Sequence, residues 1–235
     1  MIELNSFICG DCMDYLPQFP DKYFELAIVD PPYFSGPEKR NYYGRSISPI
    51  GVKRYYKPSN EWNVPNKEYF DELIRVSENQ IIWGCNYFDY PFSSGRIVWD
   101  KCNQGSDFSD CELAFCSLHT STRLFRYMWN GMFQGKSIEE GHIQQGNKVL
   151  NEKRIHPTQK PVVLYDWLLM KYAKQGDKIL DTHVGSASSL ISFHKNGFDY
   201  IGFEKDPYYF ELANKRLEEY KSQITLWDCG VKREC

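Results

Sequence analysis

The chain has 235 residues, a length that fits one full-sized domain or one domain with an inserted subdomain. Hydrophobic residues make up 42% and charged residues 25% of it, which is ordinary globular usage and excludes a disordered or collagen-like chain. The formal net charge of −3 excludes a protein coated in positive charge but is compatible with a local basic region.

The N-terminus and the cysteines predict a cytoplasmic protein. The first residues lack the basic start and apolar run of a signal peptide, and a reducing compartment would keep the eight cysteines as thiols. Because no run of about 18 apolar residues occurs, we expect no membrane span. Cys9 and Cys12 have the spacing of a zinc or redox pair, but no second pair follows them, so we expect free thiols and no metal site.

Short apolar runs bounded by turn residues predict buried strands, and the patterns between them predict helices. The strands are expected at residues 7–9, 25–29, 80–83, 96–99, 112–116, 178–180 and 200–203. The helices are expected at residues 67–77, 161–173, 186–195 and 207–220. Strands that alternate with helices predict an α/β fold, with a mostly parallel sheet covered on both faces.

Two stretches, residues 35–66 and 119–155, show no clear apolar period. We expect both to be long loops, which in a compact domain are usually functional or mobile. Residues 1–235 are therefore predicted to form a single domain that carries a loop at 35–66 and an insert at 119–155.

Acidic residues follow five of the predicted strands. Ligands of open α/β sheets bind beyond the carboxyl ends of the strands, so these side chains are candidates for a binding site. They are Asp11, Asp30, Asp100, Asp181 and Glu204. One acid at a strand end is common by chance, but several at one edge of a sheet predict a site.

The sharpest signal is the run Asp30, Pro31, Pro32 and Tyr33. The two prolines remove two N–H donors and leave carbonyls that can only accept. A carboxylate, a rigid acceptor and an aromatic ring within four residues suit an exocyclic amino group on a planar ring, with that ring stacked on Tyr33. The purely structural interpretation is a strand that ends in a rigid turn.

This run resembles the hallmark tetrapeptide Asp/Asn/Ser-Pro-Pro-Tyr of the amino-group DNA methyltransferases, and further motifs follow in that family's order. They are Gly10-Asp11-Cys12, His156-Pro157-Thr158-Gln159-Lys160-Pro161, Asp181-Thr182-His183-Val184-Gly185-Ser186 and Tyr200-Ile201-Gly202-Phe203-Glu204. The catalytic motif precedes the cofactor loop, which is the permuted order of the beta subgroup. The resemblance covers about residues 6–219 and implies a Rossmann-like, circularly permuted methyltransferase fold with S-adenosylmethionine as cofactor.

The resemblance also implies which residues form the site. Catalysis is expected from Asp30, Pro31, Pro32 and Tyr33. Cofactor binding is expected from Asp11, Cys12, Asp30, His156, Thr158, Lys160, Asp181, His183, Gly185, Ser186 and Glu204. Chemically, Glu204 suits the ribose hydroxyls and Asp11 the adenine amino group of the cofactor, while Lys160 suits its methionine carboxylate.

The cofactor loop departs from the family pattern Asp-Pro-Phe-x-Gly-x-Gly at two places. Thr182-His183 stands where Pro-Phe is usual, and Ala187 replaces the last glycine. Alanine is the smallest substitute for glycine. We expect His183 to be a packed or loop histidine rather than a catalytic one.

Basic residues gather in the two loops, and double-stranded DNA is the expected partner. Tyrosines interleave with the bases of the first loop, a combination that suits phosphate contact and base extrusion, although a solvated loop is the alternative. DNA contact is expected from Lys39, Arg40, Arg45, Lys53, Arg54, Arg123 and Arg126. The insert 119–155 matches the family's target-recognition region, and its shortness predicts a short recognition sequence or a homodimer.

The resemblance implies transfer of a methyl group to adenine N6 of a base flipped out of DNA. An Asp at the head of the tetrapeptide favours adenine, whereas Ser is commoner in cytosine-N4 enzymes. Methylation of cytosine N4 is the near alternative, and methylation of RNA or of a protein amide is a more distant one. A catalytically silent DNA-binding module of the same fold is a further alternative.

Overall fold

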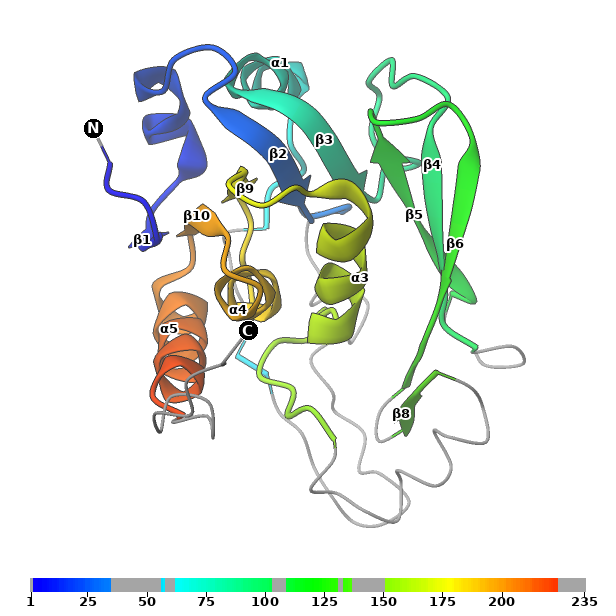
Figure 1. The fold of residues 1–235 in the computed structure, drawn as a ribbon, viewed down its shortest axis with the longest axis vertical. Helices are drawn as coiled ribbons and strands as arrows, with labels where there is room; N and C mark the ends of the chain where they lie inside the picture. Colours follow the sequence, from blue (N-terminus) through cyan, green and yellow to red (C-terminus); the bar gives the residue numbers. More distant parts are fainter. Residues whose placement is uncertain are drawn as a thin grey trace, which may run out of the picture.

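A computed structural model describes residues 2–34, 56–57, 62–102, 109–130, 133–136 and 151–223. Its centre is an eight-stranded sheet in the order β1-β10-β9-β2-β3-β5-β4-β6 (Figure 1). The strands are β1 (Ser6–Cys9), β2 (Phe24–Val29), β3 (Ser77–Trp83), β4 (Arg96–Asp100), β5 (Cys111–Cys116), β6 (Thr122–Arg126), β9 (Lys178–Asp181) and β10 (Asp199–Glu204). All seven predicted strands are confirmed.

The sheet is mostly parallel, as the sequence predicts. β1, β10, β9, β2 and β3 pair with their neighbours in parallel. β5 is antiparallel to both β3 and β4, while β4 and β6 are parallel to each other. Within this sheet β5 is therefore the one strand that runs against the others, and its first residues lie at the edge where the other strands end.

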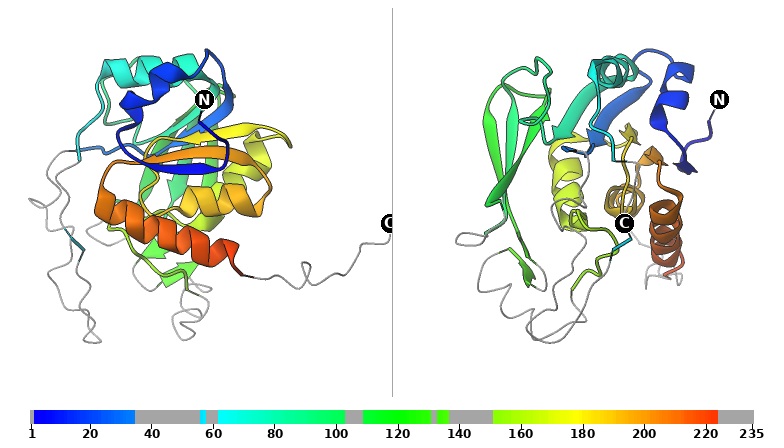
Figure 2. Two further views of the ribbon diagram at one scale, coloured as in Figure 1. Left: turned by 90° about the vertical axis from the view of Figure 1, so that its left-hand side faces the viewer. Right: turned by 180° about the vertical axis from the view of Figure 1, so that it is seen from behind.

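Four helices match the predicted ones to within about two residues at each end. They are α1 (Lys67–Val76), α3 (Val162–Tyr172), α4 (Ser188–Lys195) and α5 (Pro207–Lys221). The turns η1 (Cys12–Asp14) and η2 (Leu16–Gln18) lie with α1 on one face of the sheet, whereas α3, α4 and α5 lie on the other (Figures 1 and 2). Local capping explains two of the helix starts, because Asn66 accepts from the Tyr69 N–H and Asp206 accepts from the Tyr208 N–H.

Side chains of β2 alternate between two hydrophobic clusters, one on each face. Leu26 and Ile28 belong to the cluster that includes α3, α4 and α5 residues. Ala27 and Val29 belong to the cluster formed with α1, η1 and η2. Because successive side chains of a strand point to opposite faces, a strand buried on both sides reads as a continuous apolar run. A sheet covered on both faces is thus confirmed.

The expectation of a loop throughout residues 119–155 is wrong for its first part. β6 and the small hairpin of β7 (Met128–Asn130) and β8 (Phe133–Gly135) lie there, with β6 at the edge of the main sheet (Figure 1). In β6 only Phe125 is buried, and the other four residues are exposed. An edge strand with so little buried surface carries no apolar run, and its sequence therefore does not read as a strand. Most of the expected loop at 35–66 lies outside the described residues.

Candidate functional site at the carboxyl edge of the sheet

Four acidic residues that follow strands lie along one edge of the sheet. Asp11, Glu204, Asp181 and Asp30 end or follow β1, β10, β9 and β2, which are neighbours and parallel. The gathering of strand-end acids at one edge is therefore confirmed.

Asp30 is held by two groups at the centre of this edge. Its Oδ2 lies 2.6 Å from Lys160 Nζ, and its Oδ1 accepts a hydrogen bond of 2.5 Å from the Tyr33 hydroxyl. Lys160 also donates to the Tyr33 hydroxyl oxygen at 3.0 Å. The Lys160 side chain is only 4% exposed, so its charge acts on Asp30 with little screening by water.

Glu112 is a member of this cluster that sequence reasoning missed. Its Oε2 lies 2.7 Å from Lys160 Nζ, and its Oε1 forms an ion pair with Lys101. Glu112 comes at the start of β5, and a strand start reaches this edge only because β5 is antiparallel. Apolar periodicity carries no information on strand direction, so no signal in the sequence marked it.

The charges of this cluster set its protonation. Burial raises the pKa of Asp30, and the charge of Lys160 opposes that rise. Burial also acts to raise the pKa of Glu112, but the ammonium groups of Lys160 and Lys101 outweigh it and hold the pKa at about 2. Lys160 loses solvation through burial, yet the carboxylates of Asp30 and Glu112 raise its pKa. The cluster therefore contains a lysine that is charged and two carboxyl groups that share it.

The Tyr33 ring is held from two sides. It stacks on Tyr87 with 5.2 Å between ring centroids and 12° between planes. It also lies against Gly84, where an added Cβ would come within 2.1 Å of Tyr33 Cε1 and where φ is +72°. Glycine is required at this position for both reasons. Tyr87 is 57% exposed, so one face of the Tyr33 ring is covered by a surface side chain.

The loop after β9 is joined to the end of β10 by Glu204. Glu204 Oε2 accepts from the Gly185 N–H at 2.8 Å, and Oε1 accepts from the Asp206 N–H at 2.9 Å. Each carboxylate oxygen can accept a further bond. Gly185 has φ +57°, and an added Cβ would make ordinary van der Waals contact with the His156 ring at 3.8 Å, so the left-handed backbone rather than crowding favours glycine here. Acceptor capacity on Glu204 beside this glycine turn fits a ligand that carries hydroxyl groups.

Ala187 adopts the left-handed conformation, with φ 61° and ψ 19°, at the start of α4. This is the position where the family pattern has glycine, and the conformation supplies the physical reason for that preference. Alanine is accommodated here with its side chain completely buried.

Both histidines expected at the site are packed within it. His183 Nδ1 lies 2.9 Å from Thr182 Oγ1, and burial lowers the pKa of His183 to about 4. The His156 ring stacks on Trp62 and meets Tyr209 edge-on, and burial lowers the pKa of His156 to about 3. Both imidazoles are therefore neutral at pH 7. Sequence reasoning missed Trp62, which lies in a stretch without periodicity.

The remaining expected cofactor residues lie at the same edge. Asp11 accepts from the Met13 N–H and pairs with Lys205 at 3.0 Å. The Cys12 thiol is buried, which raises its pKa to about 12. Thr158 donates its N–H to His156 Nδ1 at 3.3 Å. Ser186 lies between Gly185 and the start of α4.

Two of the seven expected DNA-binding residues lie in the part of the chain that the structure describes. Arg123 and Arg126 are both exposed on β6, but they are three residues apart and therefore point to opposite faces of the strand. Arg126 pairs with Asp100 at 2.8 Å. The other five lie outside the described residues: Lys39, Arg40, Arg45, Lys53 and Arg54.

Cys9 is exposed, whereas Cys12 is buried, and both are free thiols. In the part of the chain that the structure describes, no three His, Cys, Asp or Glu side chains are grouped so that they could hold a metal ion. None of the helices in that part has the length and apolar character that a membrane span requires.

The raised pKa of Asp181 leads us to expect that the free energy of unfolding depends on pH. Burial raises its pKa from 3.8 to about 7, against the opposing hydrogen bond from the His183 N–H. An acid whose pKa is higher in the folded chain takes up a proton on folding, so its contribution to stability falls as pH rises from about 4 to about 7. Asp181→Asn removes this term, and the stability of the variant relative to the unmodified chain should rise by up to about 4 kcal/mol over that range. Urea unfolding of both chains between pH 4 and pH 7.5 measures it, and a difference independent of pH would contradict the assignment.

Fold and site together define an α/β protein of Rossmann-like type, with a carboxylate-rich ligand edge and an Asp-Pro-Pro-Tyr turn at its centre. A family model described as DNA methylase, of the N6/N4 type, matches residues 55–215. The chain therefore belongs to the N6/N4 DNA methylase family and is an S-adenosylmethionine-dependent DNA methyltransferase.

Relatives of known name agree with this membership. The type II methyltransferase M.HinfI of Haemophilus influenzae is 26% identical over 257 residues, which cover 93% of this chain and 69% of the relative. The type II methyltransferase M2.MboI of Moraxella bovis is 24% identical and is covered to 86%, with 89% of this chain aligned. The type II methyltransferase M.HpaI of Haemophilus parainfluenzae is 25% identical, with 97% of this chain and 79% of the relative covered. All three relatives are named as type II methyltransferases.

Solved structures share the fold. The M1.HpyAVI–SAM complex superposes with a TM-score of 0.51 at 16% identity, and the match covers 90% of this chain and 98% of that one. The cytosine-N4-specific PvuII DNA methyltransferase superposes with a TM-score of 0.52 at 14% identity, covering 94% and 91%. The Rossmann-like methyltransferase fold that the sequence predicts is thus confirmed.

Proposed function

We propose that this chain transfers a methyl group to N6 of an adenine flipped out of double-stranded DNA. The observation that carries the proposal is the position of Asp30, a largely buried carboxylate fixed by Lys160 beside the Tyr33 ring at the cofactor edge of the sheet. A carboxylate at the head of the tetrapeptide can accept an N–H of the adenine amino group. The Pro31 carbonyl is the second acceptor.

Asp30 has acceptor capacity left for a substrate. A carboxylate offers about four lone-pair sites, and here Lys160 and Tyr33 use one on each oxygen. The adenine amine is a poor nucleophile because its lone pair conjugates with the ring. Two accepted N–H bonds localise that pair and aim it at the methyl carbon. Asp30 then also lies where the proton released from the methylated amine can be accepted.

The extruded base is proposed to stack on Tyr33. Stacking on an aromatic ring is worth about 1–3 kcal/mol per base, which offsets much of the few kcal/mol that extrusion costs. The exposed Tyr87 ring covers that face of Tyr33 in the free chain, so a base would take the place of Tyr87.

The loop at Gly185 is proposed to hold the cofactor, and the residues present fit it. Glu204 would accept from the ribose hydroxyls with the lone pairs that the Gly185 and Asp206 N–H groups leave free. When bound, S-adenosylmethionine supplies an electrophilic methyl group on a sulfonium cation. The other proposed cofactor residues are Asp11, Cys12, His156, Thr158, Asp181, His183 and Ser186. Lys160 as a partner of the methionine carboxylate stays a prediction, since its ammonium group is engaged by Asp30 and Glu112.

Cytosine N4 is the second candidate target, because its exocyclic amino group presents the same N–H donors. The likeness to the cytosine-N4-specific PvuII enzyme concerns the fold alone, and that fold therefore suits both targets. The Asp at the head of the tetrapeptide favours adenine.

The test is transfer of a labelled methyl group from S-adenosylmethionine to duplex DNA, followed by digestion and mass analysis. N6-methyladenine is the expected product. N4-methylcytosine alone would overturn the choice of target, and tight DNA binding without transfer would favour the silent module. Sequencing of modified bases in DNA from an expressing host would then give the recognition sequence.

We further propose that residues 1–235 form one domain and that the chain forms a homodimer. Measurement of its molecular mass in solution tests the homodimer.

A further inference from the structure

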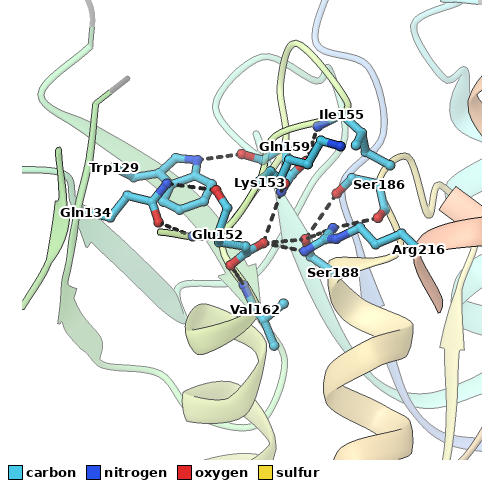
Figure 3. Close-up of polar contacts among 10 residues, drawn as sticks. All are labelled: Trp129, Gln134, Glu152, Lys153, Ile155, Gln159, Val162, Ser186, Ser188 and Arg216. Carbon is cyan, nitrogen blue, oxygen red and sulfur yellow. Dashed lines mark hydrogen bonds and ion pairs between the residues drawn. The ribbon is translucent and has the colours of Figure 1, made fainter. Parts of the chain in front are cut away.

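Glu152 lies where several segments of the structure meet (Figure 3). Its Oε1 accepts from Gln159 Nε2 at 3.0 Å and from Ser188 Oγ at 3.3 Å, and it pairs with Arg216 Nη2 at 2.5 Å. Its Oε2 accepts from the Val162 N–H at 3.0 Å. One carboxylate therefore joins the start of α3, the start of α4 and the middle of α5.

Arg216 extends this connection to the cofactor loop. Its Nη1 donates to the Ser186 carbonyl oxygen at 2.7 Å and to Ser188 Oγ at 3.0 Å (Figure 3). The Arg216 side chain is 15% exposed, and its ion pair with Glu152 fixes the direction of the guanidinium. The turn at residues 185–188 is thus held from one side by Glu204 and from the other by Arg216.

This turn needs such contacts because it is strained. Ala187 lies within it in the left-handed conformation, which is unfavourable for a residue with a Cβ. The start of α4 has no hydrogen bond from a capping side chain. A strained conformation persists only where the surroundings over-determine it, and the contacts of Glu152 and Arg216 supply that constraint.

The backbone of Glu152 is tied to the hairpin of β7 and β8. Gln134 of β8 is 3% exposed, and its side chain both accepts from the Glu152 N–H at 2.8 Å and donates to the Glu152 carbonyl at 3.0 Å (Figure 3). Trp129 of β7 donates to the Gln159 carbonyl at 2.6 Å. The hairpin belongs to the insert where target recognition is expected.

We infer that Glu152 is a positioning residue for the cofactor site: through Arg216 and Ser188 it holds the turn at 185–188 in its binding conformation and joins it to the β7–β8 hairpin. Glu152 itself touches no reacting atom. The inference rests on the proposed location of the cofactor at Gly185 and Glu204.

Glu152→Gln tests the inference with little change of shape. The amide carries no charge, so the ion pair with Arg216 is lost, and in either orientation its NH₂ group faces a donor, the Val162 N–H or the groups on Oε1, so the hold on Arg216 is weakened. We expect the dissociation constant of S-adenosylmethionine, measured by calorimetry on the full chain, to rise about tenfold, which corresponds to about 1.4 kcal/mol.

Asp166→Asn is the matched control. Asp166 also links α3 to α4 and also accepts from three side chains, Ser192, Lys195 and Asn196, but at the far end of α4. It should lower the unfolding temperature and leave cofactor affinity within about twofold. If Glu152→Gln lowers the unfolding temperature in the same way without weakening cofactor binding, Glu152 is merely structural and the inference is wrong.

Arg216→Gln removes the same ion pair from the α5 side, and it replaces Glu152→Gln as the test if that variant does not fold. It should weaken cofactor binding to a similar degree, and the double variant should be no weaker than about the worse single one, because both changes remove one connection. Additive effects would overturn the inference. A separate variant, Glu204→Gln, tests whether the cofactor binds at Gly185 and Glu204 at all. If this variant binds S-adenosylmethionine as well as the unmodified chain does, the proposed location of the cofactor is wrong, and the inference about Glu152 is wrong with it.

Discussion

Asp30→Ala is expected to lower the rate of methyl transfer by at least about 10²–10³-fold, the usual effect of removing a preorganised group that acts on the reacting atoms. The variant keeps Lys160 paired with Glu112 at 2.7 Å, so no buried charge is left alone and the chain should fold. Cofactor affinity should change by no more than a few-fold. Single-turnover assays with labelled S-adenosylmethionine, with calorimetry for cofactor binding, measure both effects.

Glu25→Ala is the matched control for Asp30→Ala. Glu25 belongs to the same strand, β2, and its carboxylate also binds a lysine, Lys178, at 2.8 Å, but it lies near the opposite end of the strand. Its loss should leave the transfer rate within a few-fold. If Asp30→Ala retained its activity, Asp30 would not be the acceptor for the target amine.

Lys160→Met is expected to move the acid limb of the pH–rate profile to higher pH and to lower the rate at pH 7. Burial raises the pKa of Asp30 and the charge of Lys160 opposes that rise, so removal of the charge lets the pKa rise further. The ionised carboxylate is the better acceptor, and its fraction at a given pH then falls. The profile of kcat against pH, between about pH 5 and pH 9, measures the shift.

Two outcomes of the Lys160→Met experiment separate two roles for this lysine. An unshifted profile with a weakened affinity for S-adenosylmethionine would mean that Lys160 binds the methionine carboxylate. A shifted profile with cofactor affinity nearly unchanged would mean that it holds and tunes Asp30. Lys178→Met, which breaks the comparable pair with Glu25, should change neither quantity.

Much of the fold could be predicted from the sequence because buried parallel strands carry their own signal. β2 is buried on both faces, and its run of apolar residues shows this directly. The helix starts at α1 and α5 are likewise local, since Asn66 and Asp206 bond to N–H groups two or three residues on. β6 escaped prediction because an exposed edge strand buries one side chain, Phe125, and so has no apolar pattern.

Some residues of the site could likewise be predicted from the sequence, and others could not. Parallel strands end at one edge of a sheet, so the sequence predicts that acids which follow such strands are neighbours. The proximity of four acids depends only on this rule: Asp11, Glu204, Asp181 and Asp30. Lys160 was readable as a member of the site from its motif, but its two carboxylate partners were not. They lie 130 and 48 residues away along the chain, at distances that folding alone closes.

By itself, the sequence determined the strand-and-helix alternation, the order of the motifs and the residue types that a donor of methyl groups and an amine require. Local interactions and burial patterns encode all of these within a few residues. Only the tertiary structure decided that Glu112 shares Lys160 with Asp30, that Tyr87 covers the Tyr33 ring and that Glu152 ties the cofactor turn to the hairpin. Strand direction and long-range packing bring these groups together, and neither leaves a periodic trace in the chain.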